Sequence, residues 1–307
     1  MQPVSMARQS PSHDTKLLER LKRLQLRAQV AVDGIQKGMH RSSLRGVSTT
    51  FAQHREYVAG DDVRHLDWRI MARSDRNVLR EFEEETDLCV YFVLDASQSM
   101  SYGRTISKLE YATYIIAALA RIASQQNDRF ALAVQTSDGT KLVLPPSRGL
   151  AQWTSLCELL ARVEVDGEMD TNATMLKFSQ HLHQRSVVIW MSDFLDRAED
   201  SVQSARAFSG QRHDLWALRV LDGDEVDFPF TDLSQFEGLE DDLLLKANPL
   251  AIAEAYRVEF EDHAQDLRQQ MRSLGCTFRR LRTDASVEEN ILQVLASRDS
   301  KLARKGR

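Results

Sequence analysis

The sequence predicts an α/β protein built on a mostly parallel sheet that helices cover on both faces. From Cys89 onward, short apolar runs typical of buried strands alternate with longer segments of helical periodicity. Two of these runs, which start at Cys89 and at Ser186, end in an aspartate, Asp95 and Asp193 respectively. In such sheets ligands bind beyond the carboxyl ends of the strands, so both aspartates are predicted to lie at the ligand-binding edge.

The composition is that of an ordinary globular protein with a sizeable core. Of its 307 residues, 42% are hydrophobic and 28% are charged. Since no apolar run approaches the roughly 20 residues of a spanning helix and no signal-peptide pattern is present, we expect no transmembrane segment and a cytoplasmic location. The three cysteines Cys89, Cys157 and Cys276 are widely spaced in apolar contexts, which indicates reduced core thiols.

The N-terminal region is basic and the remainder is acidic. Residues 1–80 contain 15 basic against 8 acidic side chains, a charge of +7, whereas the rest carries −12. A basic arm is one way to bind nucleic acid or a membrane. Here the basic residues are spread out and lack interleaved aromatic residues, so we expect the two parts to neutralise each other and no nucleic-acid partner.

Hydrophobic periodicity, together with the positions of glycine, proline and polar residues, predicts six segments. Residues 1–12 are predicted to be a disordered tail, 13–34 an amphipathic helix, 35–88 a β-rich element and 89–298 the α/β domain. Within that domain, the acidic stretch 222–247 is predicted to be an insertion with a small hairpin, and 299–307 form a basic tail. The predicted strands of the domain are 89–95, 130–134, 141–144, 186–191, 215–220 and 277–281, and its helices are 107–126, 150–163, 173–183, 198–208, 249–273 and 287–297.

The candidate metal ligands lie on loops that follow the predicted strands or precede a predicted helix. Asp95, Ser97 and Ser99 place three oxygen ligands at alternate positions of one loop, and Thr171 and Asp193 follow on later loops. Carboxylates and hydroxyls are hard donors that suit Mg²⁺, Mn²⁺ or Ca²⁺ and suit zinc poorly. Because only two of the five ligands are charged, the predicted site is weak, retains waters and leaves a coordination position open.

This ligand pattern resembles the metal-ion-dependent adhesion site of von Willebrand factor type A domains. The resemblance implies a Rossmann-like type A fold in which the two serines and the threonine bind the ion directly. The two aspartates coordinate directly or through water, and an acidic side chain of a partner completes the shell. That family usually has glycine before the threonine, whereas this chain has Asp170, which would add a ligand or distort the loop.

A second resemblance covers the residues upstream of the first strand. These residues are similar to the signature of a bacterial family, domain-of-unknown-function family fifty-eight, whose members carry a type A domain downstream. Both resemblances together cover about residues 35–298. The matching residues are Gly38 to Ser42, Phe51, Arg55 to Tyr57, Gly60 to Trp68, Ala72-Arg73, Val78 to Phe82 and Glu84.

Within the signature, acids alternate with arginines. We expect Asp61, Asp62 and Asp67 to pair with neighbouring arginines in a salt-bridge and turn-capping network, with Trp68 as an anchor. A second ion site or an anion-binding surface is the alternative interpretation.

The family resemblance implies a binding function. Members are often encoded beside MoxR-type AAA+ ATPases, which implies a non-enzymatic adaptor that works with such an ATPase in protein maturation or complex assembly. The alternatives are a magnesium-dependent phosphohydrolase and attachment to nucleic acid or membrane through the basic region. A phosphohydrolase of the aspartyl-phosphate type needs a second acid two residues after Asp95, where this chain has Ser97. The client protein is not identified by the sequence.

Overall fold

The computed structural model describes residues 13–39, 54–56, 78–80, 89–167, 170–182, 185–195, 198–231, 234–237 and 244–305. The chain divides into two compact units. The larger comprises Met1–Gly38 with Leu88–Arg307, and the smaller comprises Met39–Asp87.

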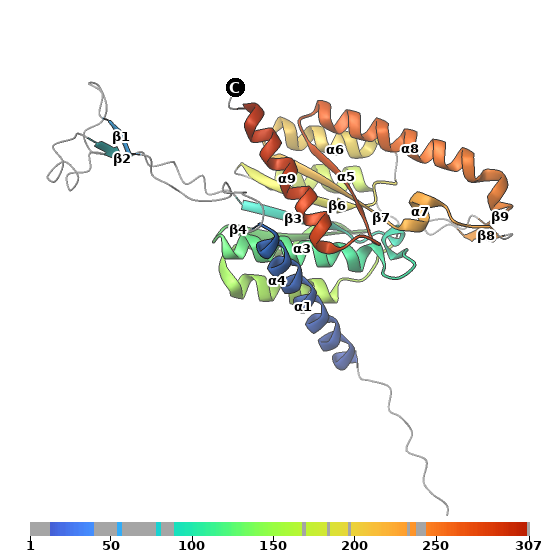
Figure 1. Cartoon of the computed structure of the whole chain (residues 1–307), viewed down its shortest axis with the longest axis horizontal. Coiled ribbons are helices and arrows are strands. Elements are labelled where there is room, and N and C mark those ends of the chain that lie inside the picture. Colours follow the sequence, from blue (N-terminus) through green and yellow to red (C-terminus); the bar gives the residue numbers. More distant parts are fainter. Residues whose placement is uncertain are drawn as a thin grey trace, which may run out of the picture. The chain divides into compact units, whose positions relative to one another are not determined.

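A six-stranded sheet forms the centre of the larger unit, with the strand order β10-β7-β6-β3-β4-β5 (Figure 1). Neighbouring strands are parallel except for β4 and β5, which form an antiparallel hairpin. The order of the strands along the chain reverses between β3 and β6, and ligands bind at such a switch point in doubly wound sheets. The strands are β3 (Cys89–Asp95), β4 (Arg129–Thr136), β5 (Gly139–Ser147), β6 (Ser186–Ser192), β7 (Asp214–Leu221) and β10 (Thr277–Arg282).

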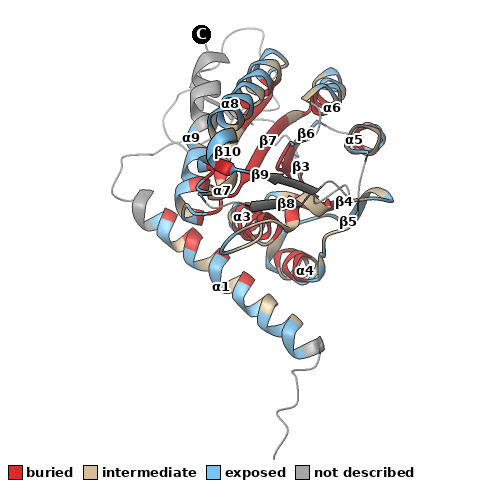
Figure 2. Ribbon diagram, turned by 90° about the vertical axis from the view of Figure 1, so that its right-hand side faces the viewer, coloured by how far each residue is buried: buried red, intermediate tan, exposed pale blue. Residues whose placement is uncertain are grey.

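Helices cover both faces of this sheet, as predicted (Figure 2). The first group surrounds α3, whose residues are buried on almost every side. This group consists of α1 (His13–Met39), α3 (Lys108–Gln125), α4 (Gly149–Arg162) and α9 (Val287–Lys305). The second group lies on the opposite face and consists of α5 (Thr171–Gln180), α6 (Ala198–Gly210) and α8 (Pro249–Ser273). The predicted fold class is therefore confirmed.

The N-terminal helix packs beside α3. Leu24, Ala28 and Val32 of α1 are buried, in continuation of the predicted apolar face. Two basic residues of the other face also find partners: Arg20 donates to the Val163 carbonyl at 3.1 Å, and Arg23 lies 3.7 Å from Glu110. Among the described helices, none is long and apolar enough to cross a membrane.

Several element ends differ from the sequence-based prediction. The helix α1 continues to Met39 instead of ending near residue 34, and the buried side chain of Ile35 accounts for the extension. Strand β5 runs through Pro145 and Pro146 to Ser147, which an edge strand tolerates because its outer N–H groups need no ladder partner. The final helix reaches Lys305, so residues 299–305 are helical where a tail was predicted.

The smaller unit contains one described pair of short strands. Strand β1 (His54–Glu56) pairs antiparallel with β2 (Val78–Arg80), within segments predicted to be extended. The signature acids Asp61, Asp62 and Asp67, together with Trp68, lie outside the described residues, as does the predicted tail 1–12.

The acidic stretch 222–247 contains more structure than a hairpin. It begins with a short helix, α7 (Gly223–Asp227), and continues into the antiparallel pair β8 (Ser234–Glu237) and β9 (Leu244–Ala247). All three cysteines are buried thiols that form no disulfide, which agrees with the predicted core thiols.

One buried histidine makes the fold sensitive to acid. Neither ring nitrogen of His213 has a hydrogen-bond partner among the described residues, and its ring packs against Phe208. Burial lowers the pKa of His213 below its ordinary value because the charged form is desolvated. The neutral form is therefore favoured by folding, so its contribution to stability is complete above about pH 6.5 and declines as the pH falls through the lowered pKa.

We predict that His213→Leu reduces the loss of stability on acidification. Urea unfolding of wild type and variant at pH 7.5 and pH 5.5 measures this, and the difference between the two pH values should be smaller in the variant. The same change at His181, which is exposed on α5, is the control and should leave the difference unaltered. A wild-type pH difference that survives in His213→Leu would show that other groups cause the acid sensitivity.

Candidate functional site

The ends of β3 and β6 bring the two predicted aspartates together. Leu94 pairs with Met191 across these parallel strands, so Asp95 lies opposite Ser192 and next to Asp193. The Ser192 hydroxyl donates to Asp95 Oδ2 at 2.6 Å. Both aspartates are buried, and burial together with the charge of Asp193 raises the pKa of Asp95 to about 7. Two like charges therefore share one poorly solvated corner of the sheet.

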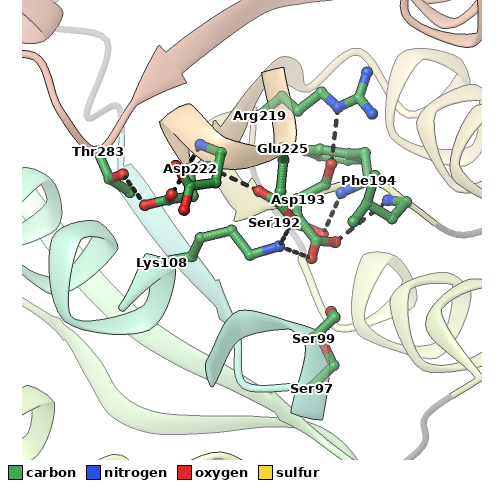
Figure 3. Close-up of polar contacts among 12 residues, drawn as sticks. Ser97, Ser99, Lys108, Ser192, Asp193, Phe194, Arg219, Asp222, Glu225 and Thr283 are labelled. Atoms are coloured by element: carbon green, nitrogen blue, oxygen red, sulfur yellow. Dashed lines mark hydrogen bonds and ion pairs between the residues drawn. The ribbon is translucent and has the colours of Figure 1, made fainter. Parts of the chain in front are cut away.

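The loop after β3 brings both predicted serines to the same corner. The Ser97 backbone N–H donates to Asp95 Oδ1 at 2.8 Å, which closes the turn. The short 3₁₀ helix η2 (Gln98–Ser101) then places Ser99 so that its hydroxyl lies 3.0 Å from that of Ser97 (Figure 3). Asp95, Ser97 and Ser99 thus form one cluster of oxygen donors, as the spacing predicts.

A lysine that sequence reasoning missed lies at the centre of the site. Lys108 is the first residue of α3, and its ammonium donates to Asp193 Oδ2 at 2.7 Å and to Glu225 Oε1 at 2.6 Å (Figure 3). Its side chain is 0% exposed. Burial lowers the pKa of such an ammonium, but the two carboxylates outweigh burial and raise the pKa of Lys108 overall, so it is charged. The signal in the sequence was a lysine in the first turn of an apolar helix, where the helix dipole disfavours positive charge.

The acidic segment 222–247 also contributes to the site, a role that the sequence did not indicate. Glu225 Oε2 accepts from the backbone N–H of Asp222 at 2.7 Å, and Asp222 accepts from Asp224 N in return, so that α7 carries its own capping box. Asp222 also accepts from the Thr283 hydroxyl at 2.6 Å. Burial raises the pKa of Glu225, while Lys108 lowers it.

The backbone around Asp193 is held in an unusual conformation. Phe194 has a φ of 50°, which is rare for an aromatic residue. Its ring packs edge-on against Trp190, with 4.7 Å between centroids, which holds this turn in place. On the other side, the buried Arg219 donates to the Asp193 carbonyl at 2.9 Å, and burial lowers the pKa of this guanidinium to about 10. The backbone at Asp193 is therefore held by the packing of Phe194 and by the bond from Arg219.

The predicted threonine begins α5, and its side chain lies outside the described part of the chain. The first turn of this helix lies beside the end of β3, because Gln135, which pairs with Asp95 in register, donates to the Thr174 hydroxyl at 2.9 Å. Asp170 is the N-cap, and its Oδ1 accepts from Ala173 N at 2.8 Å. Asp170, at the position where the type A pattern usually has glycine, therefore caps the start of this helix.

The donors fit a hard cation. Asp95, Asp193 and the two serine hydroxyls are all oxygen ligands, and a divalent ion beside Asp95 would offset the repulsion that raises its pKa. Among the described residues, no group of three or more His, Cys, Asp and Glu side chains is placed to hold a metal, so a site here depends on its hydroxyls. The residues that would hold Mg²⁺, Mn²⁺ or Ca²⁺ are Asp95, Ser97, Ser99 and Asp193, with Thr171 as the further candidate.

Comparison with known proteins identifies the family. The model of the family described as "Protein of unknown function DUF58" matches residues 53–270. The chain belongs to this family. It is 26% identical to the uncharacterised proteins Rv1480 of Mycobacterium tuberculosis and Mb1516 of Mycobacterium bovis, with 96% of this chain and 94% of each relative covered.

Solved structures similar to this DUF58 protein include type A domains. BatB from Bacteroides thetaiotaomicron superposes with a TM-score of 0.47 at 16% identity, covering 68% of this chain and 98% of BatB. The SpRpn10 VWA domain gives a TM-score of 0.42 at 10% identity, covering 67% of this chain and 94% of that domain.

We predict that Asp95→Asn removes the response to magnesium without unfolding the protein. Asparagine still accepts from Ser97 N, and the change removes one of two repelling buried charges, so the melting temperature in EDTA should equal or exceed that of the wild type. At about 100 times its Kd, magnesium should stabilise the wild type by about 2.7 kcal/mol and leave the variant unchanged.

Thermal unfolding with and without MgCl₂ measures this response. Asp138→Asn is the matched control, since Asp138 is an exposed loop carboxylate that pairs with Lys141. An equal magnesium response in Asp95→Asn and wild type would exclude Asp95 as a ligand.

Proposed function

We propose that this protein is a non-enzymatic protein-binding adaptor that recruits a partner through a divalent ion. Asp95, Ser97, Ser99, Thr171 and Asp193 hold the ion, and an acidic side chain of the partner fills the open coordination position. The observation that carries this proposal is the convergence of two buried carboxylates and two hydroxyls at the switch point of the sheet.

The surroundings of the site suit a protein partner. Ser99 is half-buried, so the donor cluster reaches the surface at this loop. Directly beside Asp193 lies Leu195, whose side chain is 42% exposed although its backbone N–H is bonded to Asp193 Oδ1. An exposed apolar side chain beside a polar binding group is typical of a protein interface, where a hydrophobic contact accompanies a central polar one.

The contacts of the site favour binding over hydrolysis. A phosphohydrolase that used Asp95 as nucleophile would need an acid at position 97, but the Ser97 hydroxyl lies against that of Ser99. Lys108 is held protonated by two carboxylates, so it does not accept a proton. These contacts support a role in which the ion is held and presented to a partner.

We take the partner to be a MoxR-type AAA+ ATPase acting with a client protein in protein maturation or complex assembly. The support for this choice is the family resemblance, since members of the family, to which this chain belongs, are often encoded beside such ATPases.

Affinity capture tests the proposal. Wild-type protein immobilised in MgCl₂ should retain the AAA+ ATPase of its own organism, identified by mass spectrometry, and should lose it in EDTA. Asp95→Ala, and Ser97→Ala combined with Ser99→Ala, should retain at least about tenfold less, because the ion no longer bridges the proteins. Asp138→Ala is the control for removal of a carboxylate, since that side chain is 76% exposed and distant in sequence from the donor loop.

Two results would contradict the proposal. The first is capture of the ATPase that is undiminished in EDTA or in the Asp95→Ala protein. The second is hydrolysis of p-nitrophenyl phosphate by wild-type protein that Asp95→Ala abolishes, which would establish an enzyme.

A further inference from the structure

Two cations would compete for the carboxylate of Asp193: the proposed divalent ion and the Lys108 ammonium. As a member of the proposed ion site it must offer oxygen to a divalent cation, yet its Oδ2 already accepts from the Lys108 ammonium at 2.7 Å. Its Oδ1 accepts from Leu195 N at 3.3 Å. A cation and an ammonium that share one buried carboxylate repel each other strongly, because little water lies between them to screen the charges.

The ammonium has a second carboxylate within reach. Lys108 Nζ lies 2.6 Å from Glu225 Oε1, and Glu225 is fixed by its other oxygen to the N-terminus of α7. The carbonyl of Glu225 also accepts from the Tyr256 hydroxyl of α8 at 2.9 Å. Glu225 is therefore a rigidly held second acceptor. Lys108 can keep its bond to Glu225 while it loses the bond to Asp193, and its side chain remains buried.

We propose that Lys108 is a built-in counter-cation that competes with the divalent ion for Asp193, with Glu225 as the carboxylate that retains the lysine when the ion binds. Lys108 is thus a positioning residue that sets the affinity and reversibility of the ion site. This inference rests on the ion site of the proposed function and adds its regulation.

Two consequences follow from this arrangement. Lys108 neutralises Asp193 from within the chain, so the fold does not depend on a bound ion. Because the ion must compete with this ammonium, ion binding is weak. Loss of the lysine would leave Asp193 and Glu225 as unpaired buried charges, which strongly destabilises a protein unless another cation replaces it. A divalent ion is such a replacement.

The test measures Mg²⁺ binding by isothermal titration calorimetry and melting temperature in EDTA and in MgCl₂. Lys108→Met should bind Mg²⁺ about tenfold more tightly or better than wild type, because the competing charge is gone. Its melting temperature in EDTA should fall by about 10 °C, and most of that loss should return with MgCl₂. Lys141→Met is the matched control, since Lys141 is a lysine of a surface ion pair and is 59% exposed; it should change neither quantity.

Glu225→Gln should have the opposite effect on affinity. Without a carboxylate at position 225 the ammonium remains with Asp193, so Mg²⁺ binding should weaken several-fold. Because Glu225→Gln retains the lysine, it tests the competition for Asp193 even if Lys108→Met fails to fold. Unchanged or tighter binding in Glu225→Gln would overturn the inference.

A double-mutant cycle separates direct competition from a general effect of charge. In an Asp193→Asn background the shared carboxylate is gone, so Lys108→Met should no longer tighten binding; a gain that persists there would overturn the inference. Wild-type protein that binds no Mg²⁺ would overturn the proposed function together with this inference. Wild-type binding with an unchanged Lys108→Met affinity would overturn the inference alone.

Discussion

One buried ammonium connects the parts of this protein that matter for its site. Lys108 joins the start of α3 to Asp193 at the end of β6 and to Glu225 in α7, through two bonds shorter than 2.8 Å. A charge buried to this degree is tolerated only when it is paired, so the positions of three separate elements depend on one another. Removal of Lys108 would leave both carboxylates without their partner.

The same constraint explains why the site lies where it does. The switch between β3 and β6 places the two aspartates at one corner, where the Lys108 ammonium pairs with Asp193. The strained backbone at Phe194 and the buried Arg219 behind it hold Asp193 toward Lys108. The proposed ion site would therefore be assembled before a cation arrives, which is the property that an exchangeable, partner-binding ion needs.

The sheet and its helices could be predicted from periodicity because each apolar strand or helix face is a local pattern. Asp95, Ser97 and Ser99 were predictable for the same reason, since all three occupy one short loop. Lys108 and Glu225 were not, because their meeting depends on how α3 and α7 pack, and 117 residues separate them. Asp222 was interpreted as the start of an insertion, since an acidic stretch with glycines gives no sign that its first residue is buried. Proline at the edge strand and the length of the last helix were set by tertiary context.

The central claim is that the carboxylates at the switch point hold an ion in exchange with Lys108. A crystal structure of the wild-type protein grown with MnCl₂, with data collected at the manganese absorption edge, tests it most directly. The account predicts an anomalous peak bounded by Asp95, Ser97, Ser99 and Asp193, with the Lys108 ammonium still bonded to Glu225 and no longer within hydrogen-bond distance of Asp193. A peak elsewhere, or none at this corner with the bond from Lys108 to Asp193 intact, would contradict it.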